Sequence, residues 1–377
     1  MYIKGVGCTK FGIGSESSVQ MVHNAVVEAL DNAQMSMKEI DLAVISNMDL
    51  FSNGERQRHS SSMLSSLFQT KFPIISVPAG CQGGGIALWT ALQLSKGENQ
   101  PINNVLVVGF EKIVANVSKK IIDEILMGGE RIYEQSEGLN FPAQNALVAQ
   151  QYMLKYGATM DDLALVAFKN HKNAFLNPKA MFYKKFVSME DIKNSHVVAS
   201  PLRLFDCSIS ANGAAAVVLS RDKTNIEIAG SAHITDCLSA FEREDMTSWP
   251  ATKLAAHQAF NQAKIKPSEI DVAELHDAFT SVELISYEDI GFAKPGEGAN
   301  LIRDGATNLE GSLPVNTGGG LKAKGHPISA TGLSQIYELV RQLRGEAGER
   351  QVQCKYALAQ NIGGAGSTVS VHILAKV

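Results

Sequence analysis

The stretch Ser36-Met-Lys-Glu-Ile-Asp-Leu-Ala-Val-Ile-Ser46 has a near copy later in the chain, Lys266-Pro-Ser-Glu-Ile-Asp-Val-Ala-Glu-Leu-His276. Each copy follows an apolar-periodic segment that is typical of a helix, 19–33 in the first half and 251–264 in the second. After each copy come a Gly-rich turn with a second helix-like segment and then a strand-like run: 81–96 and 104–109 in the first half, 326–344 and 355–360 in the second. We interpret this recurrence as duplication of one unit, the alternative being chance similarity of an amphipathic helix and the loop after it.

The alternation of strands and helices predicts an α/β protein with parallel sheets covered by helices and a pseudo-twofold relation between two cores. Strand-like runs at 212–220 and 226–229 are expected to complete the first sheet. Between the halves lies a long segment with helix-like pieces at 143–156 and 160–173, and insertions of this length usually carry binding elements. The expected domains are an N-terminal half at 1–112 and 203–225, an insertion at 113–202, and a C-terminal half at 226–377.

Composition narrows the class of protein. The 377 residues are 45% hydrophobic and 19% charged, which supports a large folded interior, and the net charge of −4 gives no basic surface for nucleic acid. Five widely spaced cysteines without a C-x-x-C pair argue against a disulfide scaffold or a structural zinc site, and no metal site is expected. The first residues lack the features of a signal peptide, and no apolar run approaches the ~20 residues of a membrane span. We therefore expect a soluble cytoplasmic protein.

Cys81 lies where a strand-like run meets a helix-like segment. The pattern predicts a short buried strand over 72–78, a turn at Ala79-Gly80 and a helix opening at Gly83. Unpaired N–H groups and the positive dipole end of a helix favour thiolate over thiol, and glycines let a substrate carbonyl approach backbone N–H groups. Cys81 is therefore a candidate nucleophile, against the common alternative of an inert buried cysteine.

Two histidines follow strand-like or loop segments where α/β folds place ligands. His276 comes directly after the run Val272-Ala-Glu-Leu, and His326 stands between Gly325 and Pro327. Taken singly, each is more often structural. A nucleophilic thiol, however, needs a base or cation beside it, and imidazole can serve as either. Together with Cys81 the two histidines predict a catalytic set.

Four segments together resemble the active-site loops of the thiolase superfamily: Val77-Pro-Ala-Gly-Cys81-Gln-Gly-Gly-Gly85, His276-Asp-Ala-Phe279, Gly325-His-Pro-Ile-Ser-Ala-Thr-Gly332 and Asn361-Ile-Gly-Gly-Ala-Gly366. Further matches at 169–178, 200–208 and 212–216 extend the resemblance over essentially the whole chain, in order. The His-Asp-x-Phe form is similar to that of archaeal and sterol-carrier-protein-type thiolases.

The resemblance implies the thiolase fold, with two duplicated βαβ-rich halves in a five-layer α-β-α-β-α arrangement and a helical insertion loop domain. It implies an acetyl-CoA C-acetyltransferase that condenses two acetyl-CoA molecules to acetoacetyl-CoA and CoA, or catalyses the reverse thiolysis, through an acyl-Cys81 intermediate. Coenzyme A thioesters would be substrates, and no permanently bound cofactor is expected.

Residue roles follow from the same resemblance. His326 would deprotonate and orient the Cys81 thiol. His276 with His326, or a water that they hold, would stabilise the enolate oxygen, and the backbone N–H groups of Cys81 and Gly363 would bind the carbonyl oxygen of the acyl-enzyme.

One departure concerns the acid/base that removes the α-proton. Better-known thiolases carry a second cysteine in the final Gly-rich loop, where this chain has Asn361, and sterol-carrier types carry it after His-Asp, where this chain has Ala278. Cys354 lies several residues upstream of that loop. General acid–base catalysis is worth about 10²–10⁴ in rate, so a replacement is needed, and the sequence does not identify it.

Three interpretations stay open. The first is the thiolase, with His276 or a polarised water as base. The second is a decarboxylating ketosynthase-like acyltransferase of the same fold, in which loss of carbon dioxide generates the carbanion. The third is a subunit that channels CoA esters and depends on partner proteins.

The same resemblance also predicts binding residues and partners. CoA recognition is assigned to the insertion, with Lys172, Lys184 and Lys185 available for phosphates, and Trp249 is placed in the pantetheine channel. The resemblance also implies a homodimer or homotetramer and a place in the mevalonate pathway. As protein partners it suggests hydroxymethylglutaryl-CoA synthase and a small zinc-ribbon/OB-fold protein.

Overall fold

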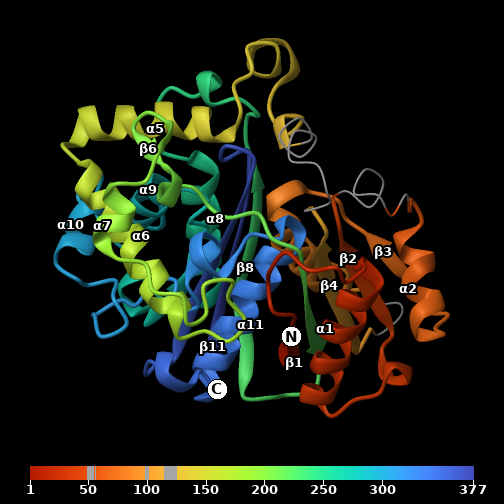
Figure 1. Cartoon of the computed structure of the whole chain (residues 1–377). Coiled ribbons are helices and arrows are strands. Elements are labelled where there is room, and N and C mark those ends of the chain that lie inside the picture. Colours follow the sequence, from red (N-terminus) through yellow and green to blue (C-terminus); the bar gives the residue numbers. More distant parts are fainter. Residues whose placement is uncertain (49–54, 56, 98–101, 114–124) are drawn as a thin grey trace.

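A computed structural model describes residues 1–48, 55, 57–97, 102–113 and 125–377. Its centre is a nine-stranded sheet with the order β3-β2-β4-β7-β1-β8-β11-β10-β9. A single paired position, Tyr2 with Glu227, joins β1 to β8 in the middle of this order. The sheet therefore consists of two halves that meet at one point, and Figure 1 shows them side by side, with the N-terminal half at the right.

The N-terminal half contributes five strands. Its elements are β1 (Tyr2–Cys8), α1 (Ser18–Ala33), β2 (Leu42–Ser46), α2 (Ser60–Phe68), β3 (Ile74–Ser76), α3 (Gly83–Leu94), β4 (Asn104–Glu111) and β7 (Gly213–Ser220). β3, β2 and β4 are parallel, whereas β7 runs antiparallel to both β4 and β1.

The C-terminal half contributes four strands in the corresponding order. Its elements are β8 (Ile226–Thr235), α8 (Pro250–Ala263), β9 (Val272–Glu274), α9 (Thr280–Ile290), α10 (Gly298–Arg303), α11 (Thr331–Arg344), β10 (Tyr356–Gly363) and β11 (Thr368–Lys376). β9 and β10 are parallel, and β11 is antiparallel to both β10 and β8. The order β9-β10-β11-β8 thus repeats β2-β4-β7-β1, which confirms the duplicated fold.

The Glu-Ile-Asp repeat has one structural function in both halves. Asp41 accepts hydrogen bonds from the backbone N–H groups of Asn103 (2.8 Å) and Asn104 (2.9 Å) at the start of β4. Asp271 accepts the equivalent bonds from Lys355 (2.7 Å) and Tyr356 (2.9 Å) at the start of β10. Each aspartate therefore fixes the entry of one strand next to its parallel neighbour.

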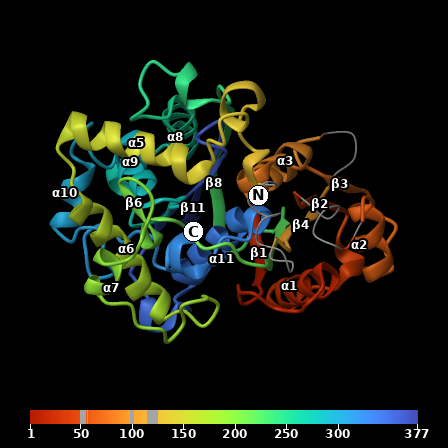
Figure 2. The same ribbon diagram turned by 45° about the horizontal axis from the view of Figure 1, so that its top comes forward.

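Helices form three layers around the two half-sheets. α1 packs on the outer face of the first half and α8 on the outer face of the second, whereas α3 and α11 contact strands of both halves and each other. Figures 1 and 2 show α11 between the two halves in both views. A helix between two sheets is buried on several sides, and residues of α11 are buried from Thr331 to Val340. This is the five-layer arrangement of the thiolase fold.

The insertion covers the C-terminal half. It contains α5 (Phe141–Tyr156), α6 (Met160–Phe175), α7 (Met189–Lys193), β5 (Val197–Ala199) and β6 (Leu202–Arg203). α5 and α6 pack on α9, and α6 also packs on α10. The helix-like piece predicted at 143–156 ends at the expected position, since the next residue, Gly157, has a φ of 71° and its N–H donates to the carbonyl of Met153.

Three expectations about strands are wrong. The sheets are mixed, because β7 and β11 reverse direction within each half. Residues 226–229 belong to β8, which pairs along its length with β11 of the second half and meets the first half only through Glu227. β3 is an edge strand with exposed residues, including Ile75 at 38% exposure, because it has a neighbour on one side only.

Gly230 allows β8 to lie directly on α8, and this contact can be tested. A Cβ at this position would stand 2.2 Å from the carbonyl oxygen of Ala259. This oxygen belongs to a helix backbone and cannot move aside. We expect Gly230→Ala to lower the free energy of unfolding by about 1–3 kcal/mol. The control is Gly12→Ala, where no atom lies within 4 Å. Chemical denaturation of both variants would show the difference, and equal stabilities would contradict this account.

Candidate active site

Cys81 lies in a one-turn 3₁₀ helix, Gly80–Gln82, that leads directly into α3. The turn before it requires Gly80 to adopt a φ of 53°, which glycine accepts without strain. The side chain is half-buried and is a free thiol. Strand end, turn and helix start therefore hold Cys81 by its backbone, as predicted.

A cavity of about 520 Å³ opens beside Cys81. Its wall comes from the Cys81 turn, the 125–145 segment, the loop at 207–210, the start of α9, the loop before α11 and the end of β10. The side chains that line it are mostly apolar and include Phe141, Trp249, Phe279, Val282 and Ile328. A concave apolar site with a few convergent polar groups is the usual form of a small-molecule site.

The Cys81 thiol is protonated at rest, contrary to the expectation from the helix start. Burial and the nearby Glu111 carboxylate raise its pKa to about 12. A rise of that size corresponds to about 4 kcal/mol, whereas a helix dipole contributes typically 0.3–1 and at most ~2 kcal/mol. Desolvation therefore dominates, and the thiol can lose its proton only to an acceptor that acts at the moment of reaction.

His276 follows β9 and is buried in the cavity wall at 3% exposure. The strand end is fixed by the Asn316 side chain, which accepts a hydrogen bond from Leu275 N at 2.8 Å. The His276 ring meets that of His326 edge to face, with ring centroids 5.5 Å apart and an interplanar angle of 86°. The structure thus brings together both predicted histidines, one from β9 and one from the loop before α11.

Asn361 connects the Cys81 turn to His276. Its Oδ1 accepts the backbone N–H of Gly85 at 3.1 Å, and its Nδ2 faces the carbonyl oxygen of Cys81 at 3.0 Å and Nδ1 of His276 at 3.2 Å. A backbone N–H can only donate and a carbonyl can only accept, so these two contacts fix the orientation of the amide. Nδ1 of His276 must then accept a hydrogen bond, and neutral His276 carries its proton on Nε2.

His326 is oriented by a hydroxyl on the first residue of α11. Its Nδ1 lies 2.7 Å from Oγ1 of Thr331, and its backbone N–H donates to the carbonyl of Ile209 at 2.8 Å. Burial lowers the pKa of His326 to about 4, and burial together with His326 lowers the pKa of His276 well below its usual value. Both rings are therefore neutral near pH 7.

A buried polar network supports the loop that carries His276. Asp277 accepts hydrogen bonds from the backbone N–H of Leu321 at 2.6 Å and from the side chain of Asn170 at 2.8 Å. Asn170 also binds Glu283, at 2.7 Å, and Glu283 forms a buried ion pair with Lys169. These contacts join α6, α9 and the loop before α11 around one side of the site.

The remaining predicted site residues lie at different distances from the cavity. Trp249 lines it, is 2% exposed and packs closely on Gly366, where a Cβ would lie 2.1 Å from the indole. Gly363 lies behind the Cys81 turn, since a Cβ there would meet Gln82 Cβ at 3.0 Å, and its neighbour Gly364 lines the cavity.

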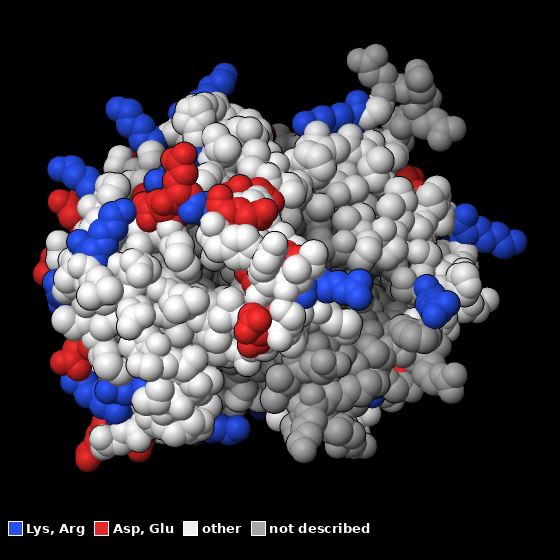
Figure 3. All heavy atoms as spheres, turned by 90° about the horizontal axis from the view of Figure 1, so that it is seen from above, with Lys and Arg blue, Asp and Glu red and all other residues white. Residues whose placement is uncertain are grey.

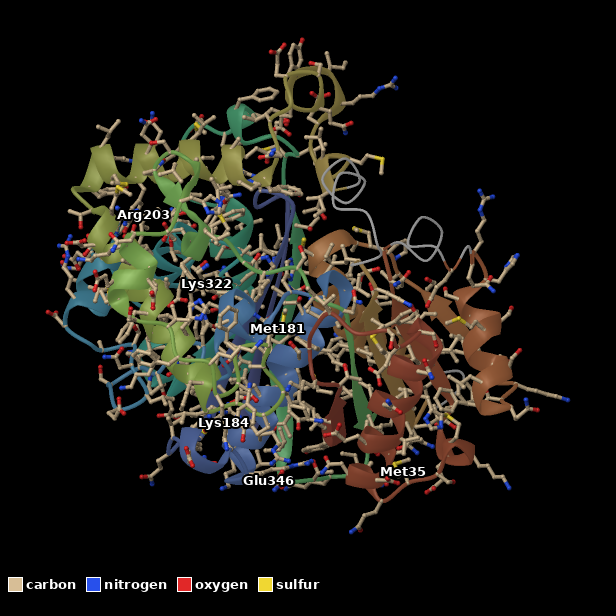
Figure 4. The ribbon with its side chains drawn as sticks, in the orientation of Figure 1. Met35, Met181, Lys184, Arg203, Lys322 and Glu346 are labelled. Atoms are coloured by element: carbon tan, nitrogen blue, oxygen red, sulfur yellow. The ribbon has the colours of Figure 1, made fainter. Side chains whose placement is uncertain are left out.

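The lysines that were expected to bind CoA phosphates lie outside the cavity wall. The Lys172 side chain is 57% exposed and stands 3.9 Å from the Glu310 carboxylate. Lys184 lies on the opposite side of the molecule from the 125–142 segment in Figure 4. Seen from above, the coloured Lys and Arg side chains stand mostly around the edge of the molecule and form no single patch (Figure 3).

Two residues of the site were not singled out from the sequence. Thr331 lies within a segment that had been matched, but its contact with His326 depends on how the loop folds back on α11. Cys207 lines the cavity from the loop after β6, and only the tertiary structure places it there. Within the residues that the structure describes, no group of three or more His, Cys, Asp and Glu could hold a metal ion. None of the described helices is long and apolar enough to span a bilayer.

Comparison with known proteins identifies the family of this chain. The family model of the thiolase N-terminal domain matches residues 3–223, and that of the thiolase C-terminal domain matches residues 232–376. The acetyl-CoA acetyltransferase of Methanothermobacter thermautotrophicus is 38% identical over 384 residues, which cover 99% of this chain and 98% of that protein. Sterol carrier protein 2 of Bos taurus is 34% identical over 392 residues, covering 98% of this chain and 71% of that protein.

Solved structures extend the comparison. The Ltp2-ChsH2(DUF35) aldolase has a TM-score of 0.83 and 26% identity, covering 100% of this chain and 97% of that one. Human mitochondrial 3-ketoacyl-CoA thiolase has a TM-score of 0.75 and 15% identity, covering 100% of this chain and 98% of that one. At this identity the likeness shows the fold alone. Since the family models and the archaeal relatives cover almost the whole chain, the protein belongs to the thiolase family and is an acyltransferase.

Proposed function

We propose that the protein is an acetyl-CoA C-acetyltransferase, which condenses two acetyl-CoA molecules to acetoacetyl-CoA and CoA or catalyses the reverse thiolysis. The observation that carries the proposal is the convergence of Cys81, His276 and His326 on one apolar cavity. The names of the archaeal relatives at 38% and 36% identity support the choice of substrate.

Acyl transfer to Cys81 is the first step. We assign to neutral His326 the tautomer in which Nδ1–H donates to Thr331 Oγ1, so that the bare Nε2 can accept the thiol proton as sulfur attacks the thioester carbonyl. Because the thiol and imidazole both favour their neutral forms, proton transfer and attack occur together. The backbone N–H groups of Cys81 and Gly363 are the proposed donors to the resulting oxyanion.

Enolate stabilisation is the proposed role of His276. Its Nδ1 is occupied by Asn361, so Nε2–H is the group that it can offer to a substrate oxygen. A neutral donor fixed in a dry site stabilises developing negative charge without reorganisation. His276 then acts as a hydrogen-bond donor to the substrate oxygen. Its hydrogen bond with Asn361 does not support the earlier alternative, in which His276 is the base that removes the α-proton.

CoA is proposed to enter beside Trp249 and the 125–145 segment, with its thioester end at Cys81. We infer a cytoplasmic homo-oligomer. A partner protein is a further proposal, and its support is that the aldolase at 26% identity was solved with the DUF35 protein named in its title.

Acylation of Cys81 provides the direct test. Incubation with acetyl-CoA should add one acetyl group to the intact chain, because the Cys81 thiol in the cavity would attack the bound thioester. Mass spectrometry of the intact chain would detect the added mass. Cys81→Ala should lose the adduct, whereas Cys354→Ala, outside the cavity wall, should keep it. An unmodified wild type would rule out both acyl-cysteine interpretations.

Substrate choice then separates the alternatives. Thiolysis of acetoacetyl-CoA by CoA supports the thiolase. Dependence on malonyl-CoA with release of carbon dioxide would instead indicate a decarboxylating synthase. Activity that appears only with an added partner protein would indicate the channelling subunit.

The tautomer of His276 can be reversed by Asn361→Asp. A carboxylate at this position accepts a hydrogen bond from Nδ1–H, which leaves Nε2 without a proton toward the cavity. We expect kcat to fall about 10²–10³-fold, the usual effect of one lost oxyanion donor. The ring-nitrogen ¹⁵N shifts of His276 should report the reversal, and the control is Asn194→Asp on an exposed helix end. Unchanged shifts would contradict the assigned hydrogen bonds.

Alkylation of Cys81 tests its pKa. Only the thiolate reacts with iodoacetamide, and a pKa raised to about 12 keeps the thiolate fraction small throughout the neutral range. The rate at Cys81, followed by peptide mass spectrometry, should therefore rise about tenfold per pH unit from 7 to 9 without levelling off. A free peptide thiol, which levels off near its own pKa of about 8.5, is the reference. A plateau for Cys81 below pH 8 would show a thiolate at rest.

A further inference from the structure

The α-proton of the second acetyl-CoA needs an acceptor in the cavity wall. Among the described residues that line the cavity, those whose side chains titrate between the acid and alkaline extremes are Cys81, Cys207, His276 and His326. Carboxylates, lysines and tyrosines do not occur among these lining residues. Among the residues that the structure describes, the candidate bases are therefore these four groups, or a water that one of them activates.

Three of the four are already engaged. Cys81 carries the acyl group during this step. In the cycle proposed below, His326 still holds the proton that it received from Cys81. His276 accepts a hydrogen bond from Asn361 on Nδ1 and has N–H on its other nitrogen, so it has no free lone pair. Cys207 is the group that is left.

Cys207 is held against the His276 loop by backbone pairing. It forms an antiparallel bridge with Phe279, and the next residue, Ser208, donates its N–H to the carbonyl of Ala278 at 2.7 Å. Side chains of directly opposed bridge residues lie on the same face, about 4.5–5.5 Å apart at Cβ. Phe279 and Cys207 both line the cavity, and at rest the Cys207 thiol donates to the carbonyl oxygen of Arg203 at 3.5 Å.

The surroundings of Cys207 place a cation next to it. The buried ammonium of Lys322 donates to the carbonyl oxygen of Cys207, and Figure 4 shows Lys322 in the interior of the C-terminal half. The Asp206 carboxylate fixes the turn before it by accepting from Arg203 N at 2.8 Å and from Thr280 Oγ1 at 2.9 Å. A thiolate at Cys207 would therefore form near the Lys322 ammonium, which lowers the pKa of this thiol, and near the Asp206 carboxylate, which raises it.

We propose that Cys207 is the catalytic acid/base of the condensation, in place of the cysteine that related enzymes carry at the position of Ala278 or Asn361. This inference rests on the proposed function, because it assigns the proton of the same reaction. Cys207 lies on the loop after β6, a segment of the chain other than those that contain Ala278 and Asn361.

The proton balance closes over one cycle. When Cys81 attacks the first acetyl-CoA, its proton goes to His326, the thioester C–S bond breaks, and the leaving CoA thiolate takes the Cys207 proton. Cys207 thiolate then removes the α-proton of the second acetyl-CoA, and the carbanion attacks the acyl carbonyl on Cys81. The C–S bond to Cys81 breaks, and Cys81 recovers its proton from His326. The enzyme returns to its starting state with acetoacetyl-CoA and CoA as products.

Cys207→Ala and Cys207→Ser separate this role from acyl transfer. Because CoA thiolate is a good leaving group, both variants should still carry one acetyl group on Cys81 after incubation with acetyl-CoA. Deuterium uptake into the acetyl-CoA methyl group in D₂O, and condensation, should fall about 10²–10⁴-fold. Cys354→Ala serves as the matched cysteine control, and thermal unfolding of each variant checks the fold.

A relocated cysteine provides the second arm. In the Cys207→Ala background, Ala278→Cys should restore at least a tenfold increase in deuterium uptake, since position 278 also lines the cavity. The proposal would be overturned if folded Cys207→Ala or Cys207→Ser took up deuterium into acetyl-CoA at a rate within about threefold of that of the wild type. A wild type that is not acetylated at Cys81 overturns the proposed function and this inference with it, whereas acetylation with unchanged exchange overturns the inference alone.

Discussion

The N-termini of α3 and α11 touch backbone to backbone, and the position of the active site depends on that contact. A Cβ on Gly84 would lie 2.7 Å from the backbone nitrogen of Leu333, and a Cβ on Gly332 would lie 2.5 Å from that of Gly85. Only glycine allows two helices to approach so closely. Cys81 comes just before one helix and His326 just before the other. Duplication of the fold thus places the nucleophile and its base on one wall, although they belong to different halves.

Asn361 reinforces the same junction from β10 and gives the two histidines different chemistry. One amide reaches the start of α3, the Cys81 carbonyl and the His276 ring. Thr331 orients His326 from the other side. As a result His276 offers N–H to the cavity, and in the tautomer proposed above His326 offers a lone pair. Two neutral imidazoles with ring centroids 5.5 Å apart can therefore serve as donor and acceptor at once.

Much of this fold could be predicted from the sequence, because the Glu-Ile-Asp repeat carries its own structural function. The aspartates at 41 and 271 bind backbone N–H groups 62 and 84 residues further along the chain, at the start of the neighbouring parallel strand, and the pattern is the same in both copies. The Cys81 pKa could not be predicted in the same way. Its direction depends on burial against distant segments and on Glu111, whereas the sequence shows only the favourable helix start. Cys207 was matched as part of a motif, but its bridge to Phe279 joins segments that only the tertiary fold brings together.

Burial shifts every titrating group of the cavity toward its neutral form. The pKa values of the Cys81 and Cys207 thiols are raised, to about 12 and about 11, and the pKa values of His276 and His326 are lowered. Desolvation is the main cause in each case, as expected for charges in an apolar environment. The resting site therefore carries no charge on these four groups, and charge develops only as bonds form and break. Lys322 lowers the pKa of Cys207 but does not cancel the effect of burial. A thiolate formed there would thus be strongly basic, which is the property that a carbon acid as weak as a thioester requires.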